Sequence, residues 1–192
     1  PPRSTLFPYT TLFRSFMQGR LRHPFRLYSN KQGTICAVIC EITLPFGLHD
    51  IVNTILDWAE KNGSHEIVIL DGVASTSHDD KAFCAAEEDL CRVMEDNDIK
   101  MIPQGFITGV AGGLLNECLV RKIQGVTLLV KANDKGPDPL AAATLVKAVN
   151  RAYHMNIDTT DLRKEKKRID ADFKELSDKY TEHRKIDSNM YM

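Results

Sequence analysis

The residues most suggestive of chemistry lie in a glycine-rich stretch from Met101 to Leu115. A short apolar run ends at Pro103, and four glycines follow it: Gly105, Gly109, Gly112 and Gly113. A glycine-rich turn that opens a helix can hold phosphate, because backbone N–H groups point at the anion. The spacing matches neither G-x-G-x-x-G nor G-x-x-x-x-G-K-[ST], and no Lys stands where a phosphate-binding loop needs one. A tight turn that packs a helix on a sheet is therefore favoured, with phosphate binding as the alternative.

Acidic side chains follow two of the predicted strands, at Glu41 and Asp71. Ligands of α/β proteins bind at the carboxyl ends of parallel strands. The sequence therefore predicts a possible ligand crevice formed by Glu41, Asp71, Gly105, Gly109, Gly112 and Gly113. An enzyme of ligase-like or phosphorylase-like type could use such a crevice. The chain has no G-x-S-x-G motif and no Cys–His pair suggested by its sequence context, so we assign no catalytic residue and favour a non-catalytic protein.

Cysteine and histidine spacing gives no sign of a metal centre. The five cysteines contain no C-x-x-C pair, and the six histidines show no ligand spacing. We expect buried, reduced thiols in a cytoplasmic protein, and neither a metal ion nor another cofactor.

Composition is that of an ordinary globular chain. The 192 residues are 43% hydrophobic and 27% charged, with a formal net charge of −1. Such a chain can bury one sizeable core, and a near-neutral balance gives no global field that would attract nucleic acid or an anionic membrane. No apolar run approaches the length of a membrane span. Nucleic acid and membranes are therefore not expected partners.

Strand and helix patterns alternate along the chain. The predicted strands are 34–42, which is continuously apolar and should be buried on both faces, then 66–70, a central strand at 99–102, and 126–130. The predicted helices start near Leu48, near Asp80 after a capping box at Ser77, after the glycine turn, and at Pro139 behind a capping Asp138. The first of them should stop at Gly63, and its apolar stripe is Leu48, Ile51, Val52, Ile55 and Ala59. This alternation predicts a three-layer α/β fold, with a mostly parallel sheet and helices on both faces.

The amino-terminal residues 1–15 look foreign to the fold. Residues 5–15 resemble the in-frame translation of a sequencing-adaptor oligonucleotide. We therefore expect an α/β domain over 16–157 whose first β-α unit is missing.

A charged segment follows the α/β domain. Residues 158–186 contain no Gly or Pro, and their apolar side chains recur at coiled-coil-like spacing. We predict an amphipathic helix whose seam is Leu162, Ile169, Phe173 and Leu176. This seam is either an oligomer contact or a face that lies on its own domain. Residues 187–192 form a predicted flexible tail.

Several motifs together resemble the proteasome assembly chaperone family in its archaeal form. They are the segments 105–109 (Gly-Phe-Ile-Thr-Gly), 113–115 (Gly-Leu-Leu) and 137–142 (Pro-Asp-Pro-Leu-Ala-Ala). The resemblance implies an α/β fold similar to nucleoside phosphorylases. Family members usually begin with a strand and a Gly-Leu-Pro-Gly-x-Gly turn, which this sequence lacks.

The resemblance also gives a meaning to the last three residues, Met190, Tyr191 and Met192. They form a hydrophobic-Tyr-X terminus, which in proteasome activators and some archaeal assembly chaperones inserts between α-subunits of the core particle. The resemblance thus implies a cytoplasmic, homo-oligomeric protein that binds proteasome α-subunits through this tail.

Overall fold

The computed structural model describes residues 15–17, 19–40, 47–77, 79–133, 136–169 and 171. The chain divides into two compact units. Unit 1 comprises Pro1–Ile67 and Gly105–Gly125, and unit 2 comprises Val68–Gln104 and Val126–Met192. The sequence pattern predicted one domain over 16–157 and did not anticipate this division.

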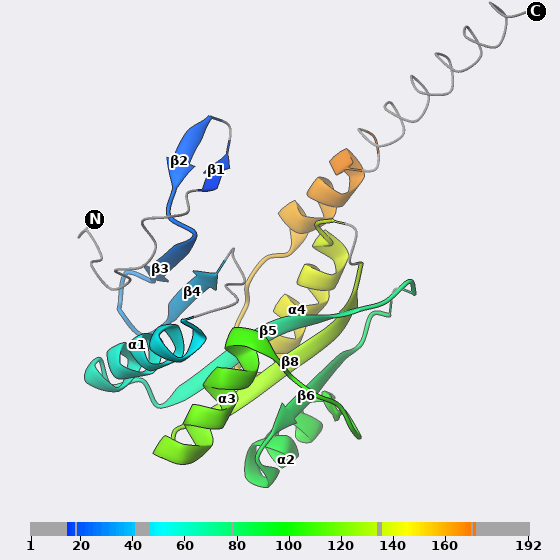
Figure 1. The fold of residues 1–192 in the computed structure, drawn as a ribbon. Helices are drawn as coiled ribbons and strands as arrows, with labels where there is room; N and C mark the ends of the chain where they lie inside the picture. The colour runs from blue at the N-terminus through cyan, green and yellow to red at the C-terminus, as the bar shows by residue number, and fades with distance from the viewer. Residues whose placement is uncertain are drawn as a thin grey trace, which may run out of the picture. The chain divides into compact units, whose positions relative to one another are not determined.

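Unit 1 opens with two antiparallel hairpins (Figure 1). The first joins β1 (Ser15–Met17) to β2 (Arg20–Arg22), and the second joins β3 (Phe25–Ser29) to β4 (Cys36–Cys40). The prediction that 34–42 is a strand buried on both faces is wrong, because all five residues of β4 are exposed. A continuous apolar run does not reveal how many strands flank it. Here its partner among the described strands is β3.

The described residues of unit 1 also form two helices. Helix α1 (Leu48–Lys61) buries most of the predicted stripe, namely Ile51, Val52, Ile55 and Ala59. Leu56 is buried as well, whereas Leu48 is only half-buried. The chain leaves α1 through Gly63, whose φ is +71°, and the Ser64 N–H donates to the Ala59 carbonyl over 2.9 Å. This confirms the predicted glycine stop. Helix α3 (Gly109–Arg121) packs against α1.

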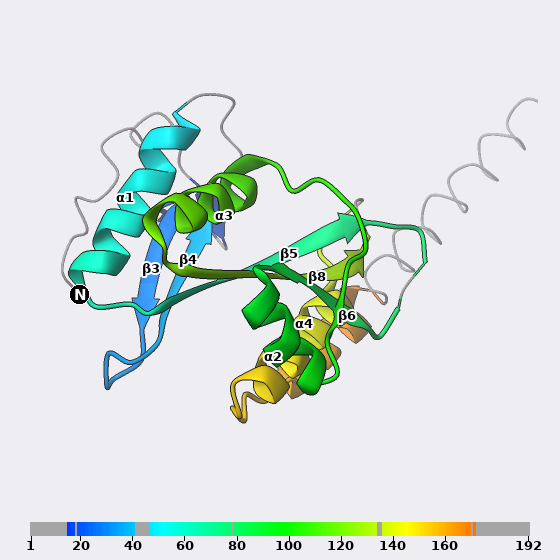
Figure 2. The same ribbon diagram turned by 90° about the horizontal axis from the view of Figure 1, so that it is seen from below.

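A four-stranded sheet lies in unit 2, except for the first two residues of β5 and of β8, which belong to unit 1. Its order is β5-β8-β6-β7, with bounds Glu66–Ala74, Gln124–Ala132, Ala82–Ala86 and Lys100–Met101. Strand β6 runs parallel to β7 and antiparallel to β8. Strands β5 and β8 run in the same direction (Figure 2). The predicted mostly parallel sheet is thus confirmed, with one antiparallel pairing. The segment 99–102 contributes the edge strand β7, so its prediction as a central strand is wrong.

Helices α2 (Glu88–Asp96) and α4 (Pro139–Ala152) cover one face of this sheet. They bury a common core of apolar side chains: Leu90, Cys91, Met94, Ala141, Ala148 and Ala152 pack on Ala82, Cys84, Val126, Leu128 and Val130. The helix predicted from Asp80 begins later, at Glu88, because 82–86 pairs with β8 as a strand. The start of α4 is as predicted, since the Ala141 N–H donates to Asp138 Oδ1 over 3.1 Å.

The charged carboxyl-terminal segment is helical at 160–169 and 171. The rest of the helix predicted for 158–186, and the tail at 187–192, lie outside the described residues. The predicted α/β class is confirmed. Within the part of the chain that the structure describes, no helix is both long enough and apolar enough to cross a bilayer.

Candidate functional site

The glycine-rich stretch forms an exposed loop from Pro103 to Thr108 that leads into α3. A Cβ added at Gly112 would lie 2.3 Å from the Ile107 carbonyl oxygen, and one added at Gly113 would lie 2.8 Å from Val52 Cγ2. These two glycines therefore let α3 approach its own entry loop and helix α1. This geometry favours the tight-turn interpretation over phosphate binding, with α1 as one packing partner of α3. A Cβ added at Gly125 of β8 would lie 2.9 Å from Cys118 Cβ, so α3 also lies close against a strand of the sheet. At Gly109, a φ of +68° supplies the left-handed turn.

The predicted ligand crevice stays a prediction. Glu41 lies outside the described residues. Asp71 lies within β5, which continues to Ala74, so it does not end a strand as expected. Its Oδ1 accepts a hydrogen bond from the Gly72 N–H at 2.7 Å. Asp71 belongs to unit 2, whereas Gly105, Gly109, Gly112 and Gly113 belong to unit 1.

Two of the buried thiols, those of Cys84 and Cys118, are poor nucleophiles. Burial raises the pKa of Cys84 to about 12, and the neighbouring Cys91 thiol adds to this effect. Burial likewise raises the pKa of Cys118. The raised pKa keeps these two thiols almost wholly protonated at neutral pH. The thiolate is the reactive form of cysteine, so both side chains react poorly as nucleophiles. By contrast, Cys36 and Cys40 are exposed, so the expectation of buried thiols is wrong for these two.

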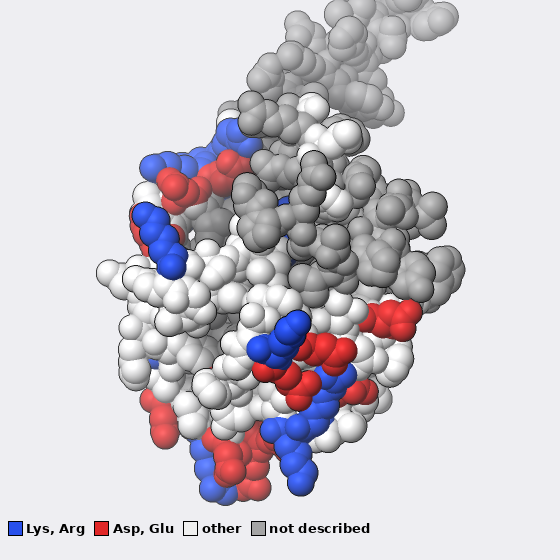
Figure 3. Space-filling view, turned by 90° about the vertical axis from the view of Figure 1, so that its left-hand side faces the viewer, with Lys and Arg blue, Asp and Glu red and all other residues white. Residues whose placement is uncertain are grey.

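Among the described residues, no group of three His, Cys, Asp or Glu side chains is placed to hold a metal ion. On the face of the molecule shown in Figure 3, Lys and Arg side chains lie next to Asp and Glu side chains. The described residues on that face therefore form no extended area of a single charge.

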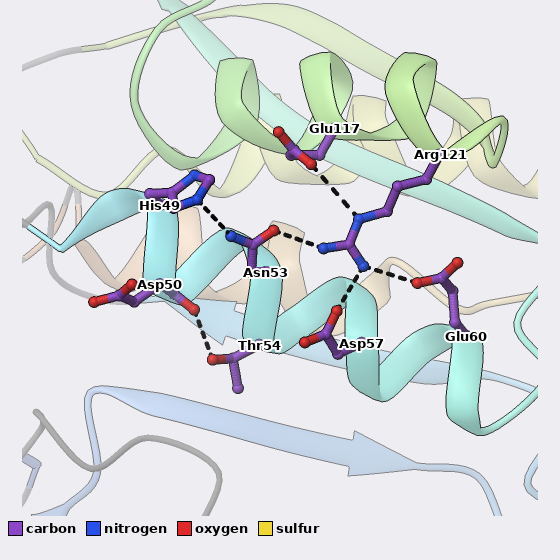
Figure 4. A network of polar contacts seen from close by, with 8 residues as sticks. All are labelled: His49, Asp50, Asn53, Thr54, Asp57, Glu60, Glu117 and Arg121. Atoms are coloured by element: carbon purple, nitrogen blue, oxygen red, sulfur yellow. Dashed lines mark hydrogen bonds and ion pairs between the residues drawn. The ribbon is translucent and has the colours of Figure 1, made fainter.

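The densest polar cluster joins α1 to α3 around Arg121 (Figure 4). The Arg121 side chain is 19% exposed. Its Nη1 donates to Asp57 Oδ1 at 2.6 Å and to Glu60 Oε2 at 2.8 Å, and its Nη2 donates to Asn53 Oδ1 at 2.6 Å. Glu117, one turn earlier on α3, adds an ion pair at 3.6 Å. Hydrogen bonds to Asp57 and Glu60 raise the pKa of Arg121, so the guanidinium stays charged.

The cluster also fixes the tautomer of His49. Arg121 can only donate, so the amide oxygen of Asn53 must face it and the amide nitrogen must face His49. His49 Nε2 lies 2.9 Å from Asn53 Nδ2. It therefore accepts this hydrogen bond, and in the neutral ring the proton is on Nδ1. Each side chain of the cluster has a polar contact with another side chain of α1 or α3. The cluster is therefore a structural link between these two helices.

Sequence reasoning missed this cluster. Its signal was present: Asn53, Asp57 and Glu60 recur at helical spacing opposite the buried stripe of α1, and Glu117 and Arg121 are four residues apart. No local pattern indicates that the polar face of α1 pairs with that of α3, because the paired residues are 61 to 68 positions apart along the chain.

Replacing Arg121 with Ala should lower the free energy of unfolding by about 1–2 kcal/mol, because three carboxylates lose their shared cation. The matched control is Arg92→Ala, which removes an exposed ion pair with Glu88 on α2. Its expected effect is below about 0.5 kcal/mol. Urea unfolding followed by circular dichroism measures both. Equal losses for the two variants would contradict the structural role of Arg121.

The structure describes only part of the predicted seam. Leu162 and Ile169 are half-buried on the helix of 160–169. Phe173 and Leu176 lie outside the described residues, as do Met190, Tyr191 and Met192. The seam and the tail therefore stay predictions.

Comparison with known proteins finds relatives both by sequence and by structure. An uncharacterized protein of Methanocaldococcus jannaschii, MJ0106, is 25% identical over 176 residues, which are 91% of this chain and 71% of that protein. The solved structure of a protein of unknown function from Thermoplasma acidophilum is 32% identical with a TM-score of 0.76, covering 91% of this chain and 73% of that one.

The fold also matches PbaA of Pyrococcus furiosus, an archaeal homologue of a proteasome-assembly chaperone. Its monoclinic form aligns with a TM-score of 0.81 and 24% identity, over 93% of this chain and 76% of PbaA. A second PbaA structure aligns with a TM-score of 0.68 and 25% identity, over 86% of this chain and 74% of PbaA. Residues 4–177 match the model of one protein family. The chain therefore belongs to the PAC2 family.

Proposed function

We propose that this chain is a non-catalytic assembly chaperone that docks on α-subunits of the proteasome core particle through its carboxyl-terminal tail. The observation that carries the proposal is membership of the PAC2 family together with the likeness to PbaA. That relative is an archaeal homologue of a proteasome-assembly chaperone, and it is 25% identical over 86% of this chain.

The chemistry of the tail supports docking. Met190, Tyr191 and Met192 offer an apolar anchor, a rigid aromatic ring and a terminal carboxylate. Such a group of contacts suits a pocket that contains a Lys, because the charged contact orients the end while the ring fills apolar space. The predicted spacer 187–189 would let the tail enter such a pocket.

A homo-oligomer agrees with this proposal, because several tails presented together would bind a ring of several pockets more tightly than one tail alone. The half-buried Leu162 and Ile169 are the described part of the seam that such an oligomer would use. An enzyme at the strand-end crevice is the weaker candidate, since the buried thiols of Cys84 and Cys118 are poor nucleophiles.

The proposal predicts direct binding to isolated α-rings. The chain and the purified α-rings of the cognate proteasome should co-sediment, with a dissociation constant in or below the range of about 1–10 µM. Analytical ultracentrifugation at fixed salt measures this constant. Rings of the β-subunits serve as the control, and they should not co-sediment. Failure to bind α-rings at about 100 µM would overturn the proposed function.

A further inference from the structure

We infer that Asn150 is a positioning residue that fixes the direction of the carboxyl-terminal helix relative to α4, and thereby presents the tail to its partner. This inference rests on the proposed function for its partner, and on the contacts of Asn150 for its geometry. Figure 1 shows the connector between α4 and the orange helix that carries the charged segment.

Asn150 lies near the end of α4 and holds the connector with both ends of its amide. Its Nδ2 donates to the Ile157 carbonyl oxygen at 2.9 Å, and the Ile157 N–H donates to its Oδ1 at 2.9 Å. Its own carbonyl oxygen accepts from the Met155 N–H at 3.0 Å. Asn150 thus holds the connector, residues 153–159, on α4 by three hydrogen bonds, which together we call the clasp.

The next residues start the helix directly from this clasp. Asp158 Oδ1 accepts from the Thr160 N–H at 2.9 Å and from the Thr160 hydroxyl at 2.6 Å, and the Arg163 N–H donates to the Thr159 carbonyl oxygen at 3.3 Å. The hydrogen bonds from Thr160 lower the pKa of Asp158. This cap is therefore present at neutral pH and is lost only as the pH falls through the lowered pKa.

The amide is the side chain that the clasp requires. Ile157 offers one donor and one acceptor of its backbone, and an amide supplies the complementary acceptor and donor at once. An Asp at position 150 could still accept from the Ile157 N–H, but its carboxylate would face the Ile157 carbonyl oxygen. With Ala at position 150, the Ile157 N–H and the Ile157 carbonyl oxygen would have to form their hydrogen bonds with water.

The direction of the first helical residues determines where the tail lies, because the predicted helix is long. If the helix continues to residue 186 as predicted from the sequence, it is about 40 Å long. A tilt of about 15° at its base then moves the tail by about 10 Å, which is larger than a pocket for one aromatic side chain. A fixed start of the helix therefore allows the tail and the rest of unit 2 to contact one partner together, at a high effective concentration.

Distance measurements test the geometric part. Spin labels are placed at the exposed positions 147 on α4 and 167 on the following helix, through Lys147→Cys and Lys167→Cys, with Cys36 and Cys40 changed to Ser. We expect a narrow distance distribution in the otherwise unchanged chain and a clearly broader one in Asn150→Ala. Asn156→Ala is the matched control, because it removes the same amide from the same connector, where no side-chain hydrogen bond is described. An unchanged distribution in Asn150→Ala overturns the inference.

Binding to α-rings tests the functional part. Asn150→Ala should bind about fivefold more weakly, toward the affinity of a free peptide of residues 187–192, because fewer molecules hold the helix in the docking direction. The affinity of Asn150→Asp for α-rings should lie between those of the wild type and of Asn150→Ala. Asn156→Ala should bind as tightly as the wild type does. If the wild type binds and Asn150→Ala binds equally well, the positioning role is overturned while the proposed function stands. If the wild type does not bind, the proposed function is overturned, and the distance distributions alone decide the role of Asn150.

Discussion

Replacing Gly112 with Ala should lower the free energy of unfolding by about 2–3 kcal/mol, because the new methyl group has no room. Its carbon would lie 2.3 Å from the carbonyl oxygen of Ile107 and 2.9 Å from the carbonyl carbon. Both atoms belong to the backbone of the loop that enters α3, so the helix start and the loop would have to separate. Within an ordinary helix the same change stabilises by about 1 kcal/mol, so the sign of the effect identifies the cause.

Two further glycines serve as controls for this change. Gly105→Ala lies in the same loop, where an added Cβ meets no atom within 4 Å, and its effect should be below about 0.5 kcal/mol. Gly113→Ala should destabilise less than Gly112→Ala, because its neighbour at 2.8 Å is the side chain of Val52, which can shift more easily than backbone. Urea unfolding of the three variants gives the comparison. A Gly112→Ala protein as stable as the wild type would contradict the close contact between the loop and α3.

The sequence was sufficient where local chemistry decides the structure. Helix α1 has an apolar stripe with a glycine stop, and α4 has Asp138 and Pro139 at its start, so both were predicted near their observed bounds. Capping residues and helical periodicity act within a few residues, and they operate whatever the rest of the chain does.

The predictions failed where pairing between distant segments decides the structure. Residues 82–86 are rich in alanine and lie next to a good helical pattern, yet they pair with residues of β8 that are 40 to 48 positions further along the sequence. That pairing overrides the local helical preference. The exposure of β4 has a similar origin, because burial depends on how many neighbours a strand has, and the composition of the strand does not state this.

The candidate site was predictable to different degrees. The spacing of Gly105, Gly109, Gly112 and Gly113 indicated a turn, and the structure shows why Gly112 and Gly113 must be small. The cluster around Arg121 needed the packing of α1 on α3, which no local pattern specifies. The clasp of Asn150 on Ile157 is invisible in the sequence, because many exposed Asn residues near a helix end have no such partner.

Removal of Met190, Tyr191 and Met192 should leave folding intact and weaken binding to α-rings by about 2 kcal/mol or more, which is roughly a thirtyfold increase in the dissociation constant. A chain end makes few native contacts, so the thermal midpoint should stay within about 1–2 °C. The tyrosine ring buries a large rigid area at low entropic cost, whereas the carboxylate makes a charge-assisted contact. Titration of purified α-rings at fixed salt measures the loss.

Two more variants separate the contributions within the tail. Tyr191→Ala should reproduce most of the loss, because the ring supplies most of the buried area. One residue added after Met192 keeps every side chain but moves the carboxylate, so it should also weaken binding if the terminal charge must pair with a Lys in the pocket. A matched substitution in the spacer, Ser188→Ala, alters neither group and should bind as the wild type does. Equal binding by the truncated and intact chains would show that the tail is incidental, and any contact with the proteasome would then have to come from the two compact units.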